Sequence, residues 1–192
     1  MFISPESRQS KYLTQNQAGV RGGKFIKSTT GGLSDPDVPS DNVSRTPPPD
    51  GKIASADNPH AYKLDGIRDE YGNPWNTNAV TNGQALAVKI SLPMPKIRRI
   101  SAFMTKSNWD NSQVLSRLQF DLNNPVYTRT YNCAPHFDCN EEIPNGLAPT
   151  DPLEFSFNMP PRTVGHHVLL LEFDDPTSGD ALYQVIDFRY TN

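Results

Sequence analysis

The sequence predicts an all-β fold, an antiparallel β-sandwich, from three observations. Short runs of apolar and β-branched residues recur after residue 80, and turn-forming residues separate them. The 192 residues include 18 prolines and 12 glycines, which interrupt regular structure. No stretch repeats apolar residues with the 3.6-residue period of an amphipathic helix. We therefore expect one β-sandwich domain spanning residues 1–192.

Residues 1–50 form the first expected region of this domain. They are rich in Ser, Gly, Pro, Asn and Asp, with Gly-Gly pairs at 22–23 and 31–32 and three prolines at 47–49. This composition predicts a long loop region rather than a core element, and we place it inside the domain. A flexible tail is the alternative.

Five expected strands follow the loop region, at residues 85–90, 99–104, 153–157, 168–173 and 183–188. The L-E-F-S-F run alternates cleanly, which puts Leu153, Phe155 and Phe157 on one buried face. Short runs of this kind between turns are typical of an antiparallel sandwich.

Charge and hydropathy exclude two classes of partner. The net charge of -3 and the pI near 5.8 provide no basic field for nucleic acid. Lys96, Arg98 and Arg99 make only a small basic cluster. No apolar run approaches the length of about 18 residues that a membrane-spanning helix needs, so we expect no membrane span.

Four segments carry a resemblance to a known family. They read I-S-P-E-S-R at 3–8, P-D-G-K-I-A-S-A-D at 49–57, K-S-N-W-D-N-S-Q-V-L-S-R at 106–117 with F-D-L at 120–122, and G-H-H-V-L-L at 165–170 with A-L-Y-Q-V-I-D at 181–187. In this order they resemble motifs of the chitin-binding lytic polysaccharide monooxygenases, auxiliary activity family 10. The resemblance implies an immunoglobulin/fibronectin-III-like sandwich.

The resemblance also implies where a copper site would lie. In the family, copper is held by the terminal amine, the ring of a first-residue histidine and a second histidine. Here the first residue is Met1, and matching backward from the third motif places the second histidine on Pro95, or on Met94 after a one-residue slip. The aromatic residue beside one axial position becomes Leu182. Since proline and thioether do not replace imidazole, we expect no copper cofactor and no enzyme activity.

The opening residues also bear on localisation. They carry no basic region, no apolar region and no small-residue cleavage site of a secretory signal. We expect the protein to be cytoplasmic or to leave by a non-classical route such as an injection apparatus, a phage-like particle or lysis. A leader removed before Met1 is the alternative.

The cysteines and histidines offer weaker chemistry. Cys133 and Cys139 flank His136 and predict a disulfide in an oxidising compartment or free thiols in the cytosol. A zinc site is the alternative, although the cluster supplies at most three ligands. We expect His60 and His136 to be solvated loop residues, and the resemblance makes His167 a structural strand residue.

Acidic residues raise the possibility of glycosidase chemistry. Carboxylates are paired at 141–142 and 174–175, and Asp180 is nearby in sequence. Neighbouring residues of an extended chain point to opposite faces, so a dipeptide does not by itself make a facing acid and base. We expect solvated loop charges instead. No G-x-S-x-G, P-loop or G-x-G-x-x-G motif is present.

The resemblance implies an insoluble polysaccharide as partner, because the family lays a flat face around the copper on crystalline chitin or cellulose. The candidate carbohydrate-binding residues are Ile26, Lys27 and Asp180. The early loop lacks the family's Tyr-Glu pair, which weakens the expectation of chitin in particular. Tyr183 is expected in the core.

Three functions stay open at this point. The first is a non-catalytic protein that binds chitin or a related N-acetylglucosamine glycan. The second is a structural component of a particle, toxin or inclusion assembly, with protein partners and a homo-oligomeric state. The third is an active copper monooxygenase with a different mature N-terminus.

Overall fold

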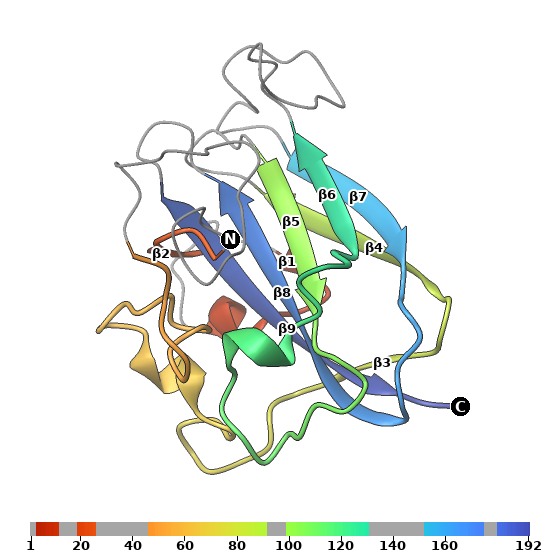
Figure 1. Cartoon of the computed structure of the whole chain (residues 1–192), viewed down its shortest axis with the longest axis horizontal. Coiled ribbons are helices and arrows are strands. Elements are labelled where there is room, and N and C mark those ends of the chain that lie inside the picture. Colours follow the sequence, from red (N-terminus) through yellow and green to blue (C-terminus); the bar gives the residue numbers. More distant parts are fainter. Residues whose placement is uncertain (1–2, 12–18, 26–45, 92–98, 131–151, 175–179) are drawn as a thin grey trace.

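The computed structural model describes residues 3–11, 19–25, 46–91, 99–130, 152–174 and 180–192. Within these ranges, nine β-strands form two sheets that pack face to face (Figure 1). The helical elements described there are three short 3₁₀ turns: η1 (Arg8–Lys11), η2 (Tyr62–Asp65) and η3 (Arg117–Gln119). None of the described helices is long and apolar enough to cross a membrane.

The two sheets differ in size. The smaller sheet has the order β1-β4-β7, from β1 (Ile3–Ser4), β4 (Ala85–Ser91) and β7 (Pro152–Asn158). The larger sheet has the order β2-β9-β8-β5-β6, from β2 (Val20–Gly22), β9 (Ala181–Tyr190), β8 (Gly165–Asp174), β5 (Arg99–Met104) and β6 (Tyr127–Thr130). A short strand, β3 (Asn78–Val80), pairs with β9 in parallel, and the other described strand pairs are antiparallel. The predicted antiparallel sandwich is confirmed.

All five predicted strands are present, as β4, β5, β7, β8 and β9. Sequence reasoning missed β1, β2, β3 and β6, which contain only two to four residues each. In strands this short, pairing with a neighbour decides the conformation more than the strand's own side-chain pattern does. Two of them, β1 and β2, lie in the region that we expected to be loop throughout.

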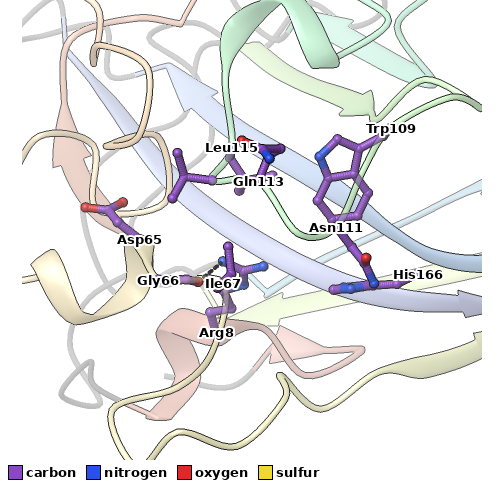
Figure 2. Close-up of a pocket in the computed structure, with 10 residues that line it drawn as sticks. Arg8, Asp65, Gly66, Ile67, Trp109, Asn111, Gln113, Leu115 and His166 are labelled. Carbon is purple, nitrogen blue, oxygen red and sulfur yellow. Dashed lines mark hydrogen bonds between the residues drawn. The ribbon is translucent and has the colours of Figure 1, made fainter.

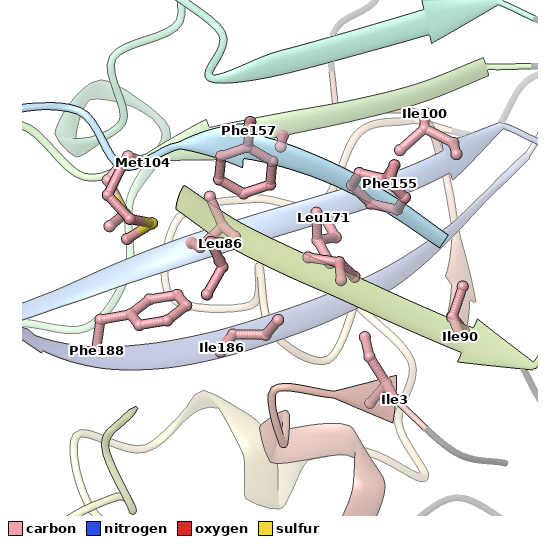
Figure 3. Close-up of a cluster of buried hydrophobic side chains, with 14 of the residues drawn as sticks. Ile3, Leu86, Ile90, Ile100, Met104, Phe155, Phe157, Leu171, Ile186 and Phe188 are labelled. Carbon is pink, nitrogen blue, oxygen red and sulfur yellow. The ribbon is translucent and has the colours of Figure 1, made fainter. Parts of the chain in front are cut away.

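The main core lies between the two sheets (Figure 3). Leu153, Phe155 and Phe157 of β7 all point into it, which confirms their predicted burial. Residues 154, 156 and 158 alternate with them on the solvent side. From β6, Tyr127 stacks on Phe155 with ring centroids 4.5 Å apart. The smaller sheet is therefore buried on one face only, as clean alternation requires.

The larger sheet is buried on both faces. In β8, Leu169 and Leu171 belong to the inter-sheet core, whereas Val168 and Leu170 belong to a second cluster on the outer face. Strand β2, the 3₁₀ turn η2 and loop segments contribute further buried side chains to the second cluster, namely Val20, Phe25, Ile53, Ala54, Ala56, Leu64, Trp75, Leu115 and Phe120. Burial on both faces explains why residues 168–171 of β8 form a continuous apolar run rather than an alternating one. The described part of the loop region thus supplies core residues, which corrects the expectation of a purely loop character.

The D-G-K-I-A-S-A-D segment packs closely beneath β2. The Gly51 N–H donates to the Leu115 carbonyl at 2.8 Å, and Ala56 adopts a left-handed conformation with φ of 53°. A Cβ on Gly22 of β2 would lie only 2.4 Å from the Ala56 carbonyl oxygen. Because no real side chain tolerates that distance, this contact requires glycine at position 22.

Candidate functional site

The strands next to the degenerate copper-site positions meet at one end of the sandwich. In the smaller sheet, Ile3 of β1 pairs with Ile90 near the end of β4. In the larger sheet, Leu182 at the start of β9 pairs with Phe173, and Ile100 of β5 pairs with the same phenylalanine. Figure 3 shows Ile3, Ile90 and Ile100 at the same end of the core. We call this region the Leu182 end.

Leu182 and Tyr183 lie on opposite faces of β9. Leu182 is 4% exposed and belongs to the inter-sheet core. Tyr183 belongs to the outer cluster and is fully buried, which confirms its predicted core position. Its hydroxyl donates to the Gly23 carbonyl. Burial, followed by the charge of nearby Glu172, raises the pKa of the Tyr183 phenol well above its ordinary value.

Two buried carboxylates at the Leu182 end are paired with arginines. Asp174 Oδ2 lies 3.2 Å from Arg99 Nη2, and Asp180 Oδ2 lies 3.9 Å from Arg21 Nη1. The expectation of solvated loop charges is therefore wrong for Asp174 and Asp180. Each guanidinium comes from a strand distant in sequence and compensates a charge that burial would otherwise destabilise. Arg21 is the more accessible partner of its pair, since 37% of its side chain is exposed.

The backbone of residues 23–25 is fixed against the outer face of β8 and β9. The Phe25 N–H donates to Glu172 Oε1 at 2.7 Å, and Arg117 Nη1 donates to the Phe25 carbonyl. The Arg117 guanidinium also lies 4.4 Å from the centroid of the Phe25 ring. These contacts fix the backbone of residue 25 against the larger sheet.

The S-P-E-S-R-Q segment anchors the described start of the chain to β9. Arg8 binds Asp187 with two contacts of 2.7 Å, and His166 Nε2 lies 2.7 Å from the same carboxylate. Gln9 accepts a hydrogen bond of 2.7 Å from the Val185 N–H. These contacts occupy the edge of β9 between its pairings with β2 and β3. The contacts of Arg8 and His166 with Asp187 were not predicted from the sequence. Arg8 and Asp187 are 179 residues apart, so no local pattern connects them.

Burial of Asp187 acts to raise its pKa, but the charge and hydrogen bonds of Arg8, with those of His166, outweigh burial. The pKa of this carboxyl therefore lies below its ordinary value. The fold therefore favours the ionised form of the Asp187 carboxyl, mainly because Arg8 is paired with it.

The other described histidines behave as predicted. His167 is buried, with Nε2 at 3.0 Å from the Thr163 carbonyl and Nδ1 at 3.3 Å from the Thr105 hydroxyl. Burial lowers its pKa, which favours the neutral ring. His60 is exposed in a loop. The structural role of His167 and the solvated state of His60 are both confirmed.

Comparison with known proteins decides the family. The family profile described as "Lytic polysaccharide mono-oxygenase, cellulose-degrading" matches residues 1–188. The chain belongs to this lytic polysaccharide monooxygenase family. A crystal structure described as a chitin binding domain from Burkholderia pseudomallei is 34% identical, covers 98% of this chain and 96% of its own, and has a TM-score of 0.75.

More distant members share the fold. An auxiliary activity family 10 monooxygenase from Streptomyces lividans is 22% identical over 96% of both chains, with a TM-score of 0.69. A Bacillus amyloliquefaciens protein solved in complex with Cu(I) is also 22% identical over 99% of both chains, with a TM-score of 0.62. No curated protein sequence matches the chain significantly.

One described residue at the Leu182 end differs from what the resemblance implies for the family's copper site. Leu182 presents an aliphatic side chain to the core, where the family has an aromatic ring. His166 and His167 pair with Arg189 and Phe188, at the far end of β9 from Leu182. Seven residues of strand separate His166 from Phe173, the partner of Leu182, which corresponds to about 23 Å. Neither histidine can therefore supply imidazole at the Leu182 end.

Several predicted positions of this family member lie outside the described residues. They are Met1, Met94 and Pro95 of the degenerate copper site, Ile26 and Lys27 of the carbohydrate-binding set, Cys133 and Cys139 with His136, and the acidic residues Glu141, Glu142 and Asp175. Asp180 is described and is buried beside Arg21. A role for Asp180 in glycan binding stays a prediction, and contact with a glycan at this point would involve the more accessible Arg21.

Proposed function

We propose that this family member binds a polysaccharide, chitin or a related N-acetylglucosamine glycan, without oxidising it. The observation that carries this proposal is the residue at the position of the second copper histidine, which is Pro95, or Met94 with a one-residue shift. Proline has no side-chain donor, and a thioether favours Cu(I) over a centre that must also stabilise Cu(II). This argument does not depend on the residue with which the chain begins.

The surroundings of Leu182 support the same proposal. A leucine that packs into the inter-sheet core provides neither a ligand nor an aromatic ring beside an axial position. The buried carboxylates Asp174 and Asp180 are already paired with Arg99 and with the more exposed Arg21. Among the described residues of the Leu182 end, we therefore find no second set of nitrogen ligands for copper.

Glycan binding is supported by similarity and by surface chemistry. The 34%-identical relative is described as a chitin binding domain. At the Leu182 end, Arg21 lines a hollow together with Thr46, Asp57 and Asn58, which offer a hydroxyl, a carboxylate and an amide. Side chains of these types form the hydrogen bonds that hydroxyl and acetamido groups require.

Retention on insoluble glycans tests this proposal. We expect the protein to be retained on crystalline chitin beads, with cellulose beads measured in parallel. An Arg21→Gln variant is expected to bind about two- to tenfold more weakly, as for the loss of one polar contact. Lys89→Gln is the control, because Lys89 is exposed on the outer face of the smaller sheet.

Absence of retention on every insoluble glycan would exclude the proposal. In that case, native mass spectrometry and solution scattering would test the assembly hypothesis. That hypothesis predicts a homo-oligomer, and a protein that remains monomeric would contradict it. Retention that Arg21→Gln and Lys89→Gln reduce equally would show that the Leu182 end is not the binding surface.

A further inference from the structure

A groove crosses the larger sheet at the end opposite Leu182. Its floor is formed by His166 of β8 and Arg189 of β9, which pair directly across the two strands. One wall comes from the segment 67–77 and the other from residues 111–112. The hollow has a volume of about 880 Å³, part of which is open to solvent. We call it the His166 groove.

A smaller cavity, with room for about one water molecule, adjoins the groove and shares Ile67, Asn111 and His166 with it (Figure 2). Trp109 also lines this cavity, and its buried indole N–H has no hydrogen-bond partner among the described residues. Buried donors are nearly always bonded to protein, water or a ligand. The inner cavity therefore presents a donor that a water molecule or a ligand oxygen can satisfy.

Local hydrogen bonds fix both walls of the His166 groove. In the first wall, Asp69 Oδ1 accepts from the Tyr71 and Asn73 N–H groups at 3.0 and 2.8 Å. The Trp75 indole donates to the Gly66 carbonyl at 2.8 Å. In the second wall, the Ser112 N–H donates to Asp110 Oδ1 at 2.9 Å. The groove is therefore preformed, which reduces the entropy lost on binding.

The lining of the groove is cationic. Arg68 and Arg189 are both exposed along it, whereas the acidic residues of the wall segments, Asp69, Glu70 and Asp110, are not among the residues that line the hollow. The Asp187 carboxylate contacts His166 of the floor, and Arg8 already neutralises it through two contacts of 2.7 Å. Neutral hydrogen-bonding side chains stand between the arginines: Thr77, Asn111 and Ser112. Ile67 and Pro74 add exposed apolar surface.

We propose that the His166 groove binds an anionic saccharide. Guanidinium groups pair with planar or tetrahedral oxyanions through two parallel hydrogen bonds, so Arg68 and Arg189 fit a carboxylate or a sulfate on the sugar. The hydroxyl and amide side chains fit sugar hydroxyls, and the apolar residues fit the C–H face of a sugar ring. This inference is independent of the proposed function, because the groove lies at the other end of the sheet and involves neither Leu182 nor Pro95.

Isothermal titration of the full chain tests the inference with three probes of equal length. They are a galacturonate hexamer, which carries carboxylates, a κ-carrageenan hexamer, which carries sulfates and no carboxylates, and the neutral chitin hexamer. We expect one or both acidic probes to bind more tightly than the neutral one. The double variant Arg68→Gln/Arg189→Gln is expected to weaken that binding about 100-fold, or roughly tenfold for each charge-assisted contact. Lys89→Gln removes the same type of charge from the smaller sheet and should leave the affinity unchanged.

Comparison of the two acidic probes identifies the anionic group. Amide resonances of His166, Asn111 and Ser112 should also shift when the tighter probe is added to the unmodified protein, whereas those of β7 should not. The inference is overturned if neither acidic probe binds at millimolar concentration. Equal affinity of the double variant and Lys89→Gln, or resonance shifts confined to other surfaces, would overturn it as well.

Discussion

Replacing Arg8 with methionine is expected to destabilise the domain by about 3–5 kcal/mol at pH 7, because it leaves a buried carboxylate without its cation. Arg8 and Asp187 are both nearly inaccessible, with side chains 4% and 1% exposed. Urea unfolding followed by tryptophan fluorescence provides the measurement. Arg8→Met keeps the aliphatic stem of the side chain, so the loss reports mainly the guanidinium group, with its ion pair to Asp187 and its hydrogen bond to the Leu64 carbonyl.

The same variant should also reverse the contribution that the Asp187 carboxyl makes to the pH dependence of the free energy of unfolding. In the unmodified protein, the pKa of Asp187 lies below its ordinary value of 3.8, so its contribution to stability is present above that value and is lost as the pH falls through the folded pKa. In Arg8→Met, burial dominates and raises the pKa of Asp187, so the variant should lose less stability, relative to the unmodified protein, at pH 4 than at pH 7.

Lys89→Met is the matched control for Arg8→Met. The Lys89–Glu154 pair has a contact of 3.2 Å, but both side chains are about 60% exposed, and solvent screening leaves such pairs with little net effect. An equal change in the free energy of unfolding for the two variants would contradict the role assigned to Arg8. So would a loss in Arg8→Met that does not depend on pH.

Replacing Phe25 with alanine is expected to cost about 3–5 kcal/mol, as for other fully buried aromatic side chains. Phe25 is fully buried, and its ring centroid lies 5.8 Å from that of Phe103 and 5.6 Å from that of Phe120. The backbone contacts of residue 25 with Glu172 and Arg117 do not require the ring and should persist. The loss therefore measures packing of the loop layer against the larger sheet.

Tyr71→Ala provides the control for Phe25→Ala. Because Tyr71 is 80% exposed, this variant should unfold like the unmodified protein. Thermal and denaturant unfolding should both remain single transitions. A cost below about 1 kcal/mol for Phe25→Ala would indicate that the region before residue 50 behaves as a tail and not as part of the cooperative unit.

The larger strands could be predicted from the sequence because their side chains record their burial. The run at 153–157 alternates, and the run at 168–171 is continuously apolar, as one-sided and two-sided burial require. The members of the second cluster that lie outside the strands could not be predicted, because Ile53, Leu64 and Trp75 come from segments that have no apolar period. Their burial depends on a sheet that is assembled from other parts of the chain.

Charged residues were the least predictable part of the candidate site. Asp174 and Asp180 stand beside proline, serine and glycine, a context typical of solvated loops. Their partners, Arg99 and Arg21, are about 75 and 159 residues away in sequence, so no local pattern connects them. The same separation concealed the contact between Arg8 and Asp187, although both belong to motifs that the sequence made conspicuous.

Titration of the natural mature protein with Cu(II) tests the central proposal most directly, with a copper-binding family member as positive control. Because the second copper histidine is replaced, we expect no tight stoichiometric binding of Cu(II). We also expect no oxidised oligosaccharides from chitin or cellulose when a reductant is added. One equivalent of tightly bound Cu(II), together with oxidised products, would contradict the proposal and identify an active copper enzyme.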